Sequence, residues 1–299
     1  MPTVAEDLQI LKSHLDEFRD TATRVLEYIK AVIDEEIEYQ DYLICSSTTA
    51  GTRKRIRPFK KELFIRNANV FDQQFKEFNG ILESLKGGTR DFEEEHFKII
   101  DSVVYTIQQS IGIGLDLLVD PNSARKHVGN RFEELIRTIL SAMNISIKKV
   151  TLSIPYDTEE GKKFYRCETD VIMSPHKKVK SDSQNVDEDE IVVTLKTTTK
   201  DRMPKIFIDK ILMERFIGHP VKIIGISLND VQRKDDRGTT KISYTFVSNL
   251  FMVYTNFLAQ LEGYYYIDIP RRALEAPFNQ YIFPFSKFIL EDIWKLLRF

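Results

Sequence analysis

The sequence predicts a mixed α/β (α+β) protein, with an all-helical region over residues 1–118 and a helix-covered mixed sheet over residues 119–299. Two observations carry this prediction. In the first region, apolar residues recur at intervals of three and four, which is the period of an amphipathic helix. In the second, helical segments alternate with short β-branched runs. We expect the first region to support the second or to mediate dimerisation.

Composition excludes several classes of protein. The chain has 299 residues, 42% hydrophobic and 29% charged, which is enough for a full core and about two domains. It has no apolar run of membrane-spanning length and no signal-peptide pattern, so we expect a soluble, cytoplasmic protein without a membrane partner. Cys45 and Cys167 lack metal-site spacing and are interpreted as packing thiols. The net charge of −2 argues against a general polycation but allows local basic patches.

The first region divides into three predicted helical segments. Residues 5–42 form one long or two consecutive helices, and further helices cover residues 62–85 and 92–118. Their broad apolar stripes are suited either to packing within the chain or to pairing with a second subunit. Between them, residues 53–61 are rich in Arg and Lys. Such a run is either a solvated linker or a set of contacts to DNA phosphates, and both interpretations stay open.

The second region opens with a turn and helix N-cap signal over residues 120–123. A hairpin turn is expected over residues 156–161, and the apolar segment 285–299 is a helix that seals either the core or a subunit contact. The predicted helices cover residues 124–143, 204–217 and 250–261, and the predicted strands cover residues 145–154, 162–173, 191–196, 221–228, 242–247 and 264–269.

Two charged residues stand at strand positions where apolar residues are expected. Asp170 interrupts one predicted strand, and Lys196 ends the next. A half-buried carboxylate is unfavourable unless it is paired or bound to a metal. Adjacent antiparallel strands bring two such side chains together. The pair is either an ordinary salt bridge or part of a catalytic site.

Two segments give the chain a resemblance to a known family. They are Lys-Thr-Thr-Thr-Lys-Asp-Arg at residues 196–202 and Gly-Asn-Arg-Phe-Glu-Glu-Leu-Ile at residues 129–136. With the order helix, acidic strand, lysine strand, helix, they resemble type II restriction endonucleases of the PD-(D/E)XK superfamily that read sites with a central CCGG. Within that group the nearest resemblance is to an enzyme that reads WCCGGW. The resemblance covers about residues 124–270 and implies a restriction-endonuclease-like core.

The resemblance implies a Mg²⁺ site. The usual (D/E)-X-K triplet reads Thr-Leu-Lys here, ending at Lys196, so the strand lacks its acid. The group commonly supplies that acid from the next helix, where Asp209 matches and Glu214 is the alternative. Asp170 and Asp209 would hold Mg²⁺, which prefers oxygen ligands, and Lys196 would position or deprotonate the attacking water.

The helix at residues 124–143 carries two neighbouring acids with different expected roles. Glu133 would orient the ligands around the metal or accept a proton, and it counts among the implied metal-binding residues. Glu134 lies about 100° further round the helix, so we expect it to be exposed.

Recognition of the DNA is implied for separate residues. Lys200, Asp201 and Arg202 hold the donors and acceptors that read neighbouring G and C bases in a major groove. The alternative is a helix N-terminus with Asp201 as its cap. Arg271 and Arg272 are candidates for contacts to outer bases or to the DNA backbone. A palindromic site implies a homodimer, or a higher oligomer, with matching two-fold symmetry.

Together these features predict a Mg²⁺-dependent type II restriction endonuclease of a prokaryotic cytoplasm. It would cut double-stranded DNA at a palindromic site with a CCGG core and leave 5′-phosphate ends with a 5′ overhang. Two alternatives stay open. One is a repair or recombination nuclease of the same fold without a fixed sequence. The other is a non-catalytic DNA-binding or helical protein in which Asp170 and Lys196 form a structural pair.

Overall fold

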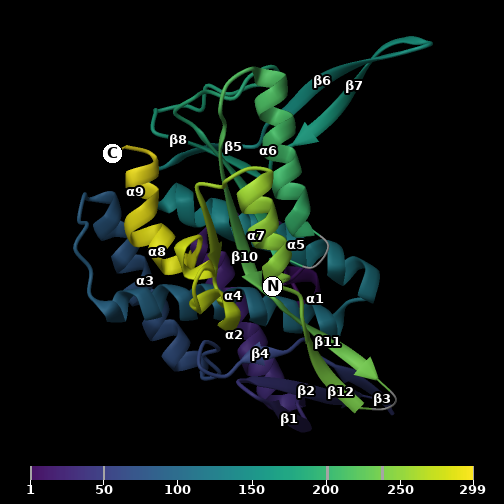
Figure 1. Cartoon of the computed structure of the whole chain (residues 1–299). Coiled ribbons are helices and arrows are strands. Elements are labelled where there is room, and N and C mark those ends of the chain that lie inside the picture. Colours follow the sequence, from purple (N-terminus) through teal and green to yellow (C-terminus); the bar gives the residue numbers. More distant parts are fainter. Residues whose placement is uncertain (1, 50, 200–201, 237–238, 299) are drawn as a thin grey trace.

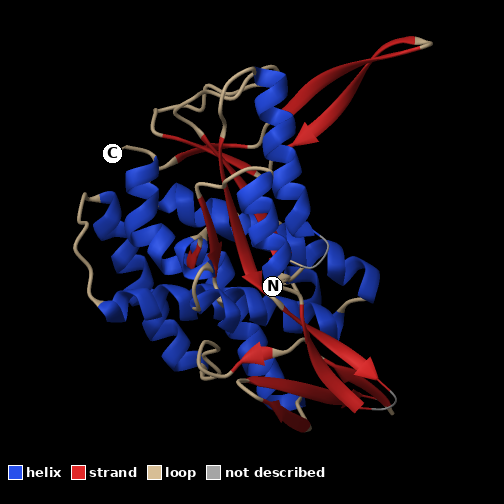
Figure 2. Ribbon diagram, viewed as in Figure 1, coloured by secondary structure: helices blue, strands red, loops and turns tan. Residues whose placement is uncertain are grey.

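The computed structural model describes residues 2–49, 51–199, 202–236 and 239–298. At its centre lies a six-stranded mixed sheet (Figures 1 and 2). In spatial order the strands are β14 (Ile282–Pro284), β13 (Gly263–Tyr266), β10 (Lys222–Asn229), β9 (Ile191–Thr198), β8 (Val171–Ser174) and β5 (Ser146–Lys148). The pairs β5–β8 and β8–β9 are antiparallel, and the remaining pairs are parallel. The mixed α+β fold class predicted from the sequence is confirmed.

Helices cover both faces of this sheet. Side chains alternate along each strand, so β9 presents apolar side chains to both faces. On one face, Val193 of β9 belongs to the same buried cluster as residues of α4 (Glu94–Leu118) and α5 (Pro121–Ala142). On the other face, Val192 packs in a cluster with residues of α6 (Met203–Ile217) and α7 (Ser248–Phe257). Three of the four helices predicted after residue 119 are therefore confirmed as α5, α6 and α7, to within a few residues at their ends.

The region over residues 1–118 is not all-helical, and this part of the prediction was wrong. Its helices are α1 (Val4–Asp7), α2 (Leu15–Val32), α3 (Ala68–Lys86) and α4, but a four-stranded sheet interrupts them. Its strands are β1 (Glu35–Tyr39), β2 (Tyr42–Thr49), β3 (Thr52–Arg55) and β4 (Phe59–Lys60). Ile37 fits both a helical and a strand period. Tertiary packing selects the strand, because β1 and β2 pack their apolar side chains against Val231 and Ile242, nearly 200 residues away in the chain.

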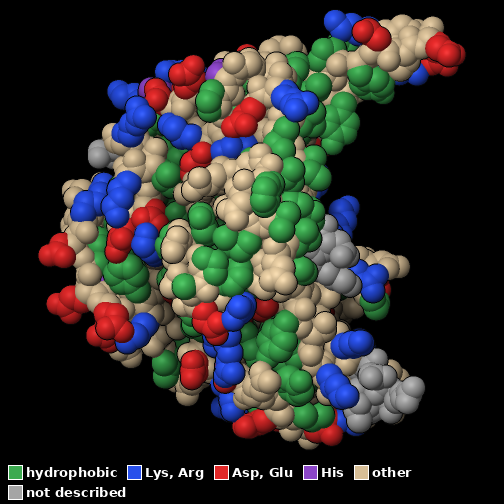
Figure 3. Space-filling model, in the orientation of Figure 1, with side chains coloured by type: hydrophobic (Ala, Val, Ile, Leu, Met, Phe, Trp, Pro, Cys, Tyr) green, Lys and Arg blue, Asp and Glu red, His purple; other side chains and the backbone are tan. Residues whose placement is uncertain are grey.

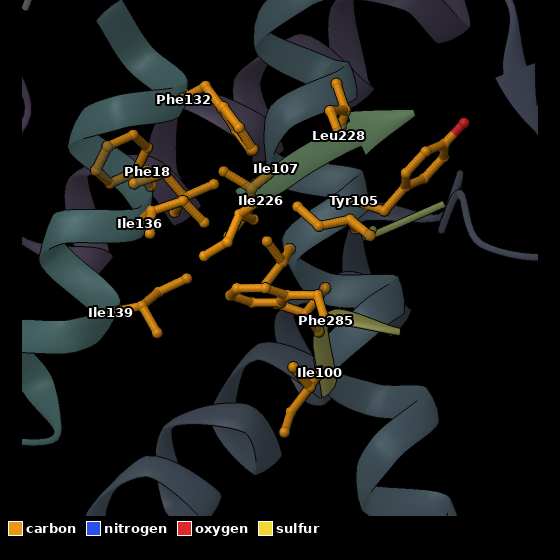
Figure 4. Close-up of a cluster of buried hydrophobic side chains, with 14 of the residues drawn as sticks. Phe18, Ile100, Tyr105, Ile107, Phe132, Ile136, Ile139, Ile226, Leu228 and Phe285 are labelled. Atoms are coloured by element: carbon orange, nitrogen blue, oxygen red, sulfur yellow. The ribbon is translucent and has the colours of Figure 1, made fainter. Parts of the chain in front are cut away.

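One continuous core joins the two predicted regions. Figure 4 shows Phe18 of α2, Ile107 of α4 and Ile136 of α5 converging on Ile226 of β10. The proposed boundary between residues 118 and 119 stays a prediction. The C-terminal segment consists of α8 (Phe285–Lys287), a π-helical segment (Phe288–Asp292) and α9 (Ile293–Leu296), and its apolar side chains are buried in this core. Of the two roles considered for it, sealing the core is confirmed.

The remaining described strands form two hairpins. β6 (Thr151–Thr158) and β7 (Gly161–Glu168) form an antiparallel hairpin that extends from the body of the molecule, and we call it the β6–β7 arm (Figure 1). Each long strand predicted here is split in two, as β5 with β6 and β7 with β8. β11 (Val231–Asp236) pairs with β12 (Thr239–Tyr244), so a strand occupies part of a predicted loop.

Two smaller expectations can be compared with the structure. Cys45 and Cys167 are both buried free thiols, as predicted. None of the helices in the described ranges is both long enough and apolar enough to cross a membrane.

Candidate active site

Strand pairing brings Asp170 and Lys196 together. Val171 of β8 lies opposite Val193 of β9, so residue 170 falls beside the end of β9. Lys196 Nζ lies 2.9 Å from Asp170 Oδ2, and the same oxygen accepts a hydrogen bond of 2.7 Å from the backbone N–H of Leu195. Both side chains keep some access to solvent, with 16% and 19% exposure. The predicted proximity of this acid and this lysine is confirmed.

Glu133 of α5 is the third member of the group. Its side chain is half-buried. Burial and the negative charge of Asp170 raise the pKa of Glu133 above its ordinary value, while the charges of Lys149, Arg137 and Lys196 act in the opposite direction. Two carboxyl groups therefore lie close enough to repel each other, with the amine of Lys196 beside them. We call Glu133, Asp170 and Lys196 the acid–lysine cluster.

The acid–lysine cluster fits a divalent cation. Burial first and the charge of Asp170 second raise the pKa of Glu133, and a divalent cation near both carboxylates would offset their repulsion. Carboxylate oxygens are the ligands that Mg²⁺ prefers, and no described His or Cys residue interacts with the cluster in the structure. Asp170 and Glu133 are thus the residues of the cluster that could hold a divalent cation.

The structure does not join the predicted displaced acid to the acid–lysine cluster. Asp209 of α6 is bound to Lys205, with hydrogen bonds of 2.7 and 2.5 Å. Glu214 accepts a hydrogen bond of 3.1 Å from the backbone of Val221. Neither acid contacts Asp170 within the part of the chain that the structure describes. The role of Asp209, or of Glu214 in its place, stays a prediction.

A second group of possible metal ligands lies on the loop between β8 and β9. His176, Asp187 and Asp189 have ligand atoms within 4.8 Å of one another. Asp189 lies 3.8 Å from His176, and Asp187 lies 3.7 Å from the amine of Lys180. Their charges are thus partly balanced already, and exposed groups of this kind are common in proteins without metals. We assign this group no role.

Glu134 is buried, and its predicted exposure was wrong. Its carboxylate accepts hydrogen bonds from the backbone of Lys12 at 3.0 Å and from Arg131 at 2.7 Å, and its exposure is 6%. The N-terminal segment covers this face of α5, since Arg131 also donates to the backbone carbonyl of Ile10. Helical spacing gives the direction of a side chain but not what packs over it.

Beside the acid–lysine cluster lies a pocket of ≈ 620 Å³, which we call the arginine pocket. Thr197 and Thr198, which follow Lys196 on β9, form part of its wall. Its remaining lining brings basic side chains together from segments far apart in the sequence. They are Arg55, Arg57, Arg125, Arg202 and Arg233.

Of the residues predicted to read bases, only Arg202 can be placed, because Lys200 and Asp201 lie outside the described residues. Arg202 stands at the N-terminal end of α6 and lines the arginine pocket. Arg271 is paired with Asp41, and Arg272 with Glu275; neither of these two arginines lines the pocket.

The basic run over residues 53–61 contributes to the arginine pocket. Arg55 and Arg57 line it, and Arg57 is held by a bidentate ion pair with Asp116, at 2.9 and 2.8 Å. The run is therefore not a solvated linker, which was one of its two interpretations. Arg125 was missed by the sequence analysis, since a single arginine near a helix start carries no distinguishing signal.

The fold is that of a type II restriction endonuclease. The solved structure of the type IIP restriction endonuclease Kpn2I matches with a TM-score of 0.70 and 18% identity, over 95% of this chain and 91% of that chain. The structure of the restriction endonuclease PspGI with its substrate DNA matches with a TM-score of 0.43 and 12% identity, over 77% of this chain and 92% of that chain. No family model matches the sequence, and no curated protein matches it significantly.

Proposed function

We propose that this protein is a Mg²⁺-dependent type II restriction endonuclease that hydrolyses phosphodiester bonds of double-stranded DNA. The observation that carries this proposal is the acid–lysine cluster, in which Lys196 Nζ lies 2.9 Å from Asp170 beside the carboxyl group of Glu133. The cluster lies next to an arginine-lined pocket in a chain with the fold of Kpn2I. An acid pair, a lysine and a site for a polyanion together suit phosphodiester hydrolysis.

Each residue of the acid–lysine cluster has its own role in the reaction. Lys196 positions the attacking water or takes its proton, and its ammonium form stabilises the charge that develops on the phosphate. Asp170 holds Lys196 in place through its ion pair. Glu133, whose pKa is raised, accepts a proton or orients the ligands around the metal. When bound by Asp170 and Glu133, with Asp209 as the proposed third ligand, Mg²⁺ adds positive charge beside the scissile phosphate. Hydrolysis leaves a 5′-phosphate and a 3′-hydroxyl.

The DNA lies across the arginine pocket in this proposal. Figure 3 shows the surface hollowed between the β6–β7 arm and the part of the molecule formed by β3, β11 and β12. Arginines of the pocket pair with phosphates, because a guanidinium presents donors that match phosphate oxygens. Lys200, Asp201 and Arg202 read the G and C bases of a CCGG core, and WCCGGW is the full site that we expect.

The two-fold symmetry of a palindromic site implies the oligomeric state that we propose for the protein. A palindrome is cut in both strands by a homodimer, or by a higher oligomer, with two-fold symmetry. The cut leaves a 5′ overhang. Arg271 and Arg272 stay candidates for outer contacts, although each is paired with an acid. The protein would work in the cytoplasm of a prokaryotic cell.

Digestion of a long DNA of mixed sequence tests the proposal. With Mg²⁺ we expect discrete fragments, and sequencing their ends gives both the recognition site and the stagger of the cut. Chelation of the metal should stop cleavage. A smear instead of discrete fragments would support the nuclease without a fixed sequence. No cleavage or nicking of any DNA would leave Asp170 and Lys196 as a structural pair and overturn the proposal.

A further inference from the structure

A small recess opens beside the arginine pocket and carries two buried amide side chains. Its volume is ≈ 180 Å³, and it shares Arg57, Thr197 and Thr198 with the arginine pocket. Gln109 of α4 and Asn229 at the end of β10 also line it. Because both of these side chains are amides, we call this cavity the amide recess.

The amides of the recess have unused hydrogen-bonding groups. Gln109 is 1% exposed and Asn229 is 5% exposed. The Gln109 amide interacts with the Tyr105 hydroxyl, whereas Asn229 Oδ1 has no hydrogen-bond partner among the described residues. Buried polar atoms nearly always have partners, so such a group points to a ligand. The lining of the recess thus includes an acceptor without a partner, Asn229 Oδ1, and the donor and acceptor of the Gln109 amide, of which the Tyr105 hydroxyl engages one.

The shape and lining of the recess select the class of ligand. Its apolar wall is formed by Pro58, Leu228 and Val231. Apolar walls with an amide at the base suit a planar heterocycle that has a donor and an acceptor on one edge. A nucleobase has this pattern, and Asn or Gln amides pair with such an edge through two hydrogen bonds.

We propose that the amide recess receives one nucleobase swung out of the DNA duplex, and this rests on the proposed function. A base stacked in a duplex does not reach Gln109, because that side chain is almost completely buried. Only an extruded base presents its pairing edge at the necessary depth. The neighbouring Arg57 and Arg233 then lie where the phosphates that flank the extruded nucleotide would pass.

Base analogues test this inference on the full-length protein. The probe is a duplex that carries the site mapped by digestion, with Ca²⁺ in place of Mg²⁺ so that binding occurs without cleavage. Each purine is replaced in turn by 2-aminopurine and each cytosine by pyrrolo-cytosine, and thymines are probed with permanganate. We expect a rise in fluorescence or reactivity of about fivefold at one position, since unstacking removes quenching of the extruded base.

Matched variants tie the signal to the recess. Gln109→Met keeps the length of the side chain but removes both polar groups, and we expect it to abolish the rise and to weaken binding about tenfold. Asn229→Ala is the second recess variant, with the same expected direction. Gln108→Met is the control, because Gln108 is equally buried on α4 and also has an amide oxygen without a partner, but it does not line the recess. The control should keep the rise.

The outcomes separate this inference from the proposed function. Normal cleavage with no rise at any position overturns the inference and leaves the endonuclease intact. A rise that persists in both Gln109→Met and Asn229→Ala places the extruded base elsewhere and overturns the assignment to this recess. A protein that neither cuts nor binds DNA overturns both proposals. Loss of the rise in both recess variants but not in Gln108→Met supports the inference.

Discussion

The groups around Lys196 favour a charged amine that can contact a polyanion. Its Nζ donates to Asp170 Oδ2 and to the carbonyl of Leu195, both at 2.9 Å. Asp170 therefore fixes the direction of the amine and balances its charge before DNA arrives. A lysine held in this way loses little side-chain entropy when it engages a phosphate, since its rotamer is already set.

The first prediction concerns Lys196→Ala. Removal of the amine should lower the single-turnover cleavage rate by about a thousandfold or more, because the water loses its positioning group. DNA affinity, measured by gel shift with Ca²⁺, should stay within a few-fold of the wild type. Lys98→Ala is the control, since Lys98 is an exposed residue of α4 that is paired with Glu94. Cleavage at the wild-type rate by Lys196→Ala would remove this assignment.

The second prediction concerns Asp230, which follows β10 and is 4% exposed. Burial and the nearby charge of Asp268 raise the pKa of Asp230 to about 6, and the charge of Lys60 acts against them. An aspartate of the unfolded chain titrates near pH 4, at about 3.9. The folded state therefore holds this proton more tightly, so the contribution of Asp230 to stability is complete below about pH 4 and is lost as the pH rises through about 6.

Asp230→Asn removes this titration while keeping the size of the side chain. The free energy of unfolding of the wild type, relative to the variant, should fall by up to about 3 kcal/mol between about pH 4 and pH 7. Urea denaturation at a series of pH values measures this difference. A difference that does not change with pH, or that grows as the pH rises, would contradict the assigned pKa shift.

At the scale of elements, α4 is a long buried helix on which distant segments rest. Its Gly112 lets Arg57 cross the helix closely, since a Cβ at this position would lie 2.3 Å from Arg57 Nη1. The ion pair between Arg57 and Asp116, also on α4, holds the guanidinium in the arginine pocket. A methyl group at position 112 would therefore displace Arg57, which lines the arginine pocket.

The third prediction is that Gly112→Ala displaces Arg57 and weakens DNA binding as much as Arg57→Ala does. Stability should change by no more than about 1 kcal/mol, because the gain in helix propensity offsets the disturbed ion pair. Fluorescence anisotropy with labelled DNA and urea denaturation give the two quantities. The control is Gly80→Ala on α3, where a Cβ meets nothing within 4 Å. That control should bind DNA normally; wild-type affinity in Gly112→Ala would show that Arg57 does not hold DNA.

Elements with one clear period were predictable from the sequence, and those decided by distant contacts were not. α5, α6 and α7 carry apolar residues at helical spacing, and β9 and β10 are apolar runs buried on both faces. In contrast, residues 35–49 form strands because their side chains pack on β11 and β12. The proximity of Asp170 and Lys196 followed from the order of two antiparallel strands. Arg125 and the buried amides could not be found in this way, because their role depends on tertiary neighbours.

At the scale of the whole molecule, charge is concentrated rather than abundant. The formal net charge is −2, yet five arginines and a single acid, Asp116, line the arginine pocket. On a chain whose net charge is −2, we expect such a focus of positive potential to favour DNA binding at this face. Arg125 and Arg202 form no ion pair with any residue in the described ranges, so they are available to phosphates.

The fourth prediction uses salt to count these contacts. Removal of one phosphate-binding cation lowers the slope of log K against log salt concentration by about 0.9 for duplex DNA. Arg125→Ala should therefore flatten the slope by about this amount and weaken binding on specific and unspecific DNA alike. Lys76→Ala is the matched control, since Lys76 is an exposed cation of α3 paired with Asp72. An unchanged slope in Arg125→Ala would show that this arginine does not touch the phosphates.

The buried carboxylate of Asp268 also has a consequence for the order in which the protein is made. It accepts a hydrogen bond of 2.8 Å from Tyr42, over a separation of 226 residues, and binds Lys60 at 3.1 Å. On the ribosome, roughly 10–45 s pass between these residues at ~5–20 residues per second. The sheet that carries Arg55 to the pocket therefore lacks its anchor until residue 268 has been made. Chains that terminate before that residue would lack the anchor and, with it, a completed arginine pocket.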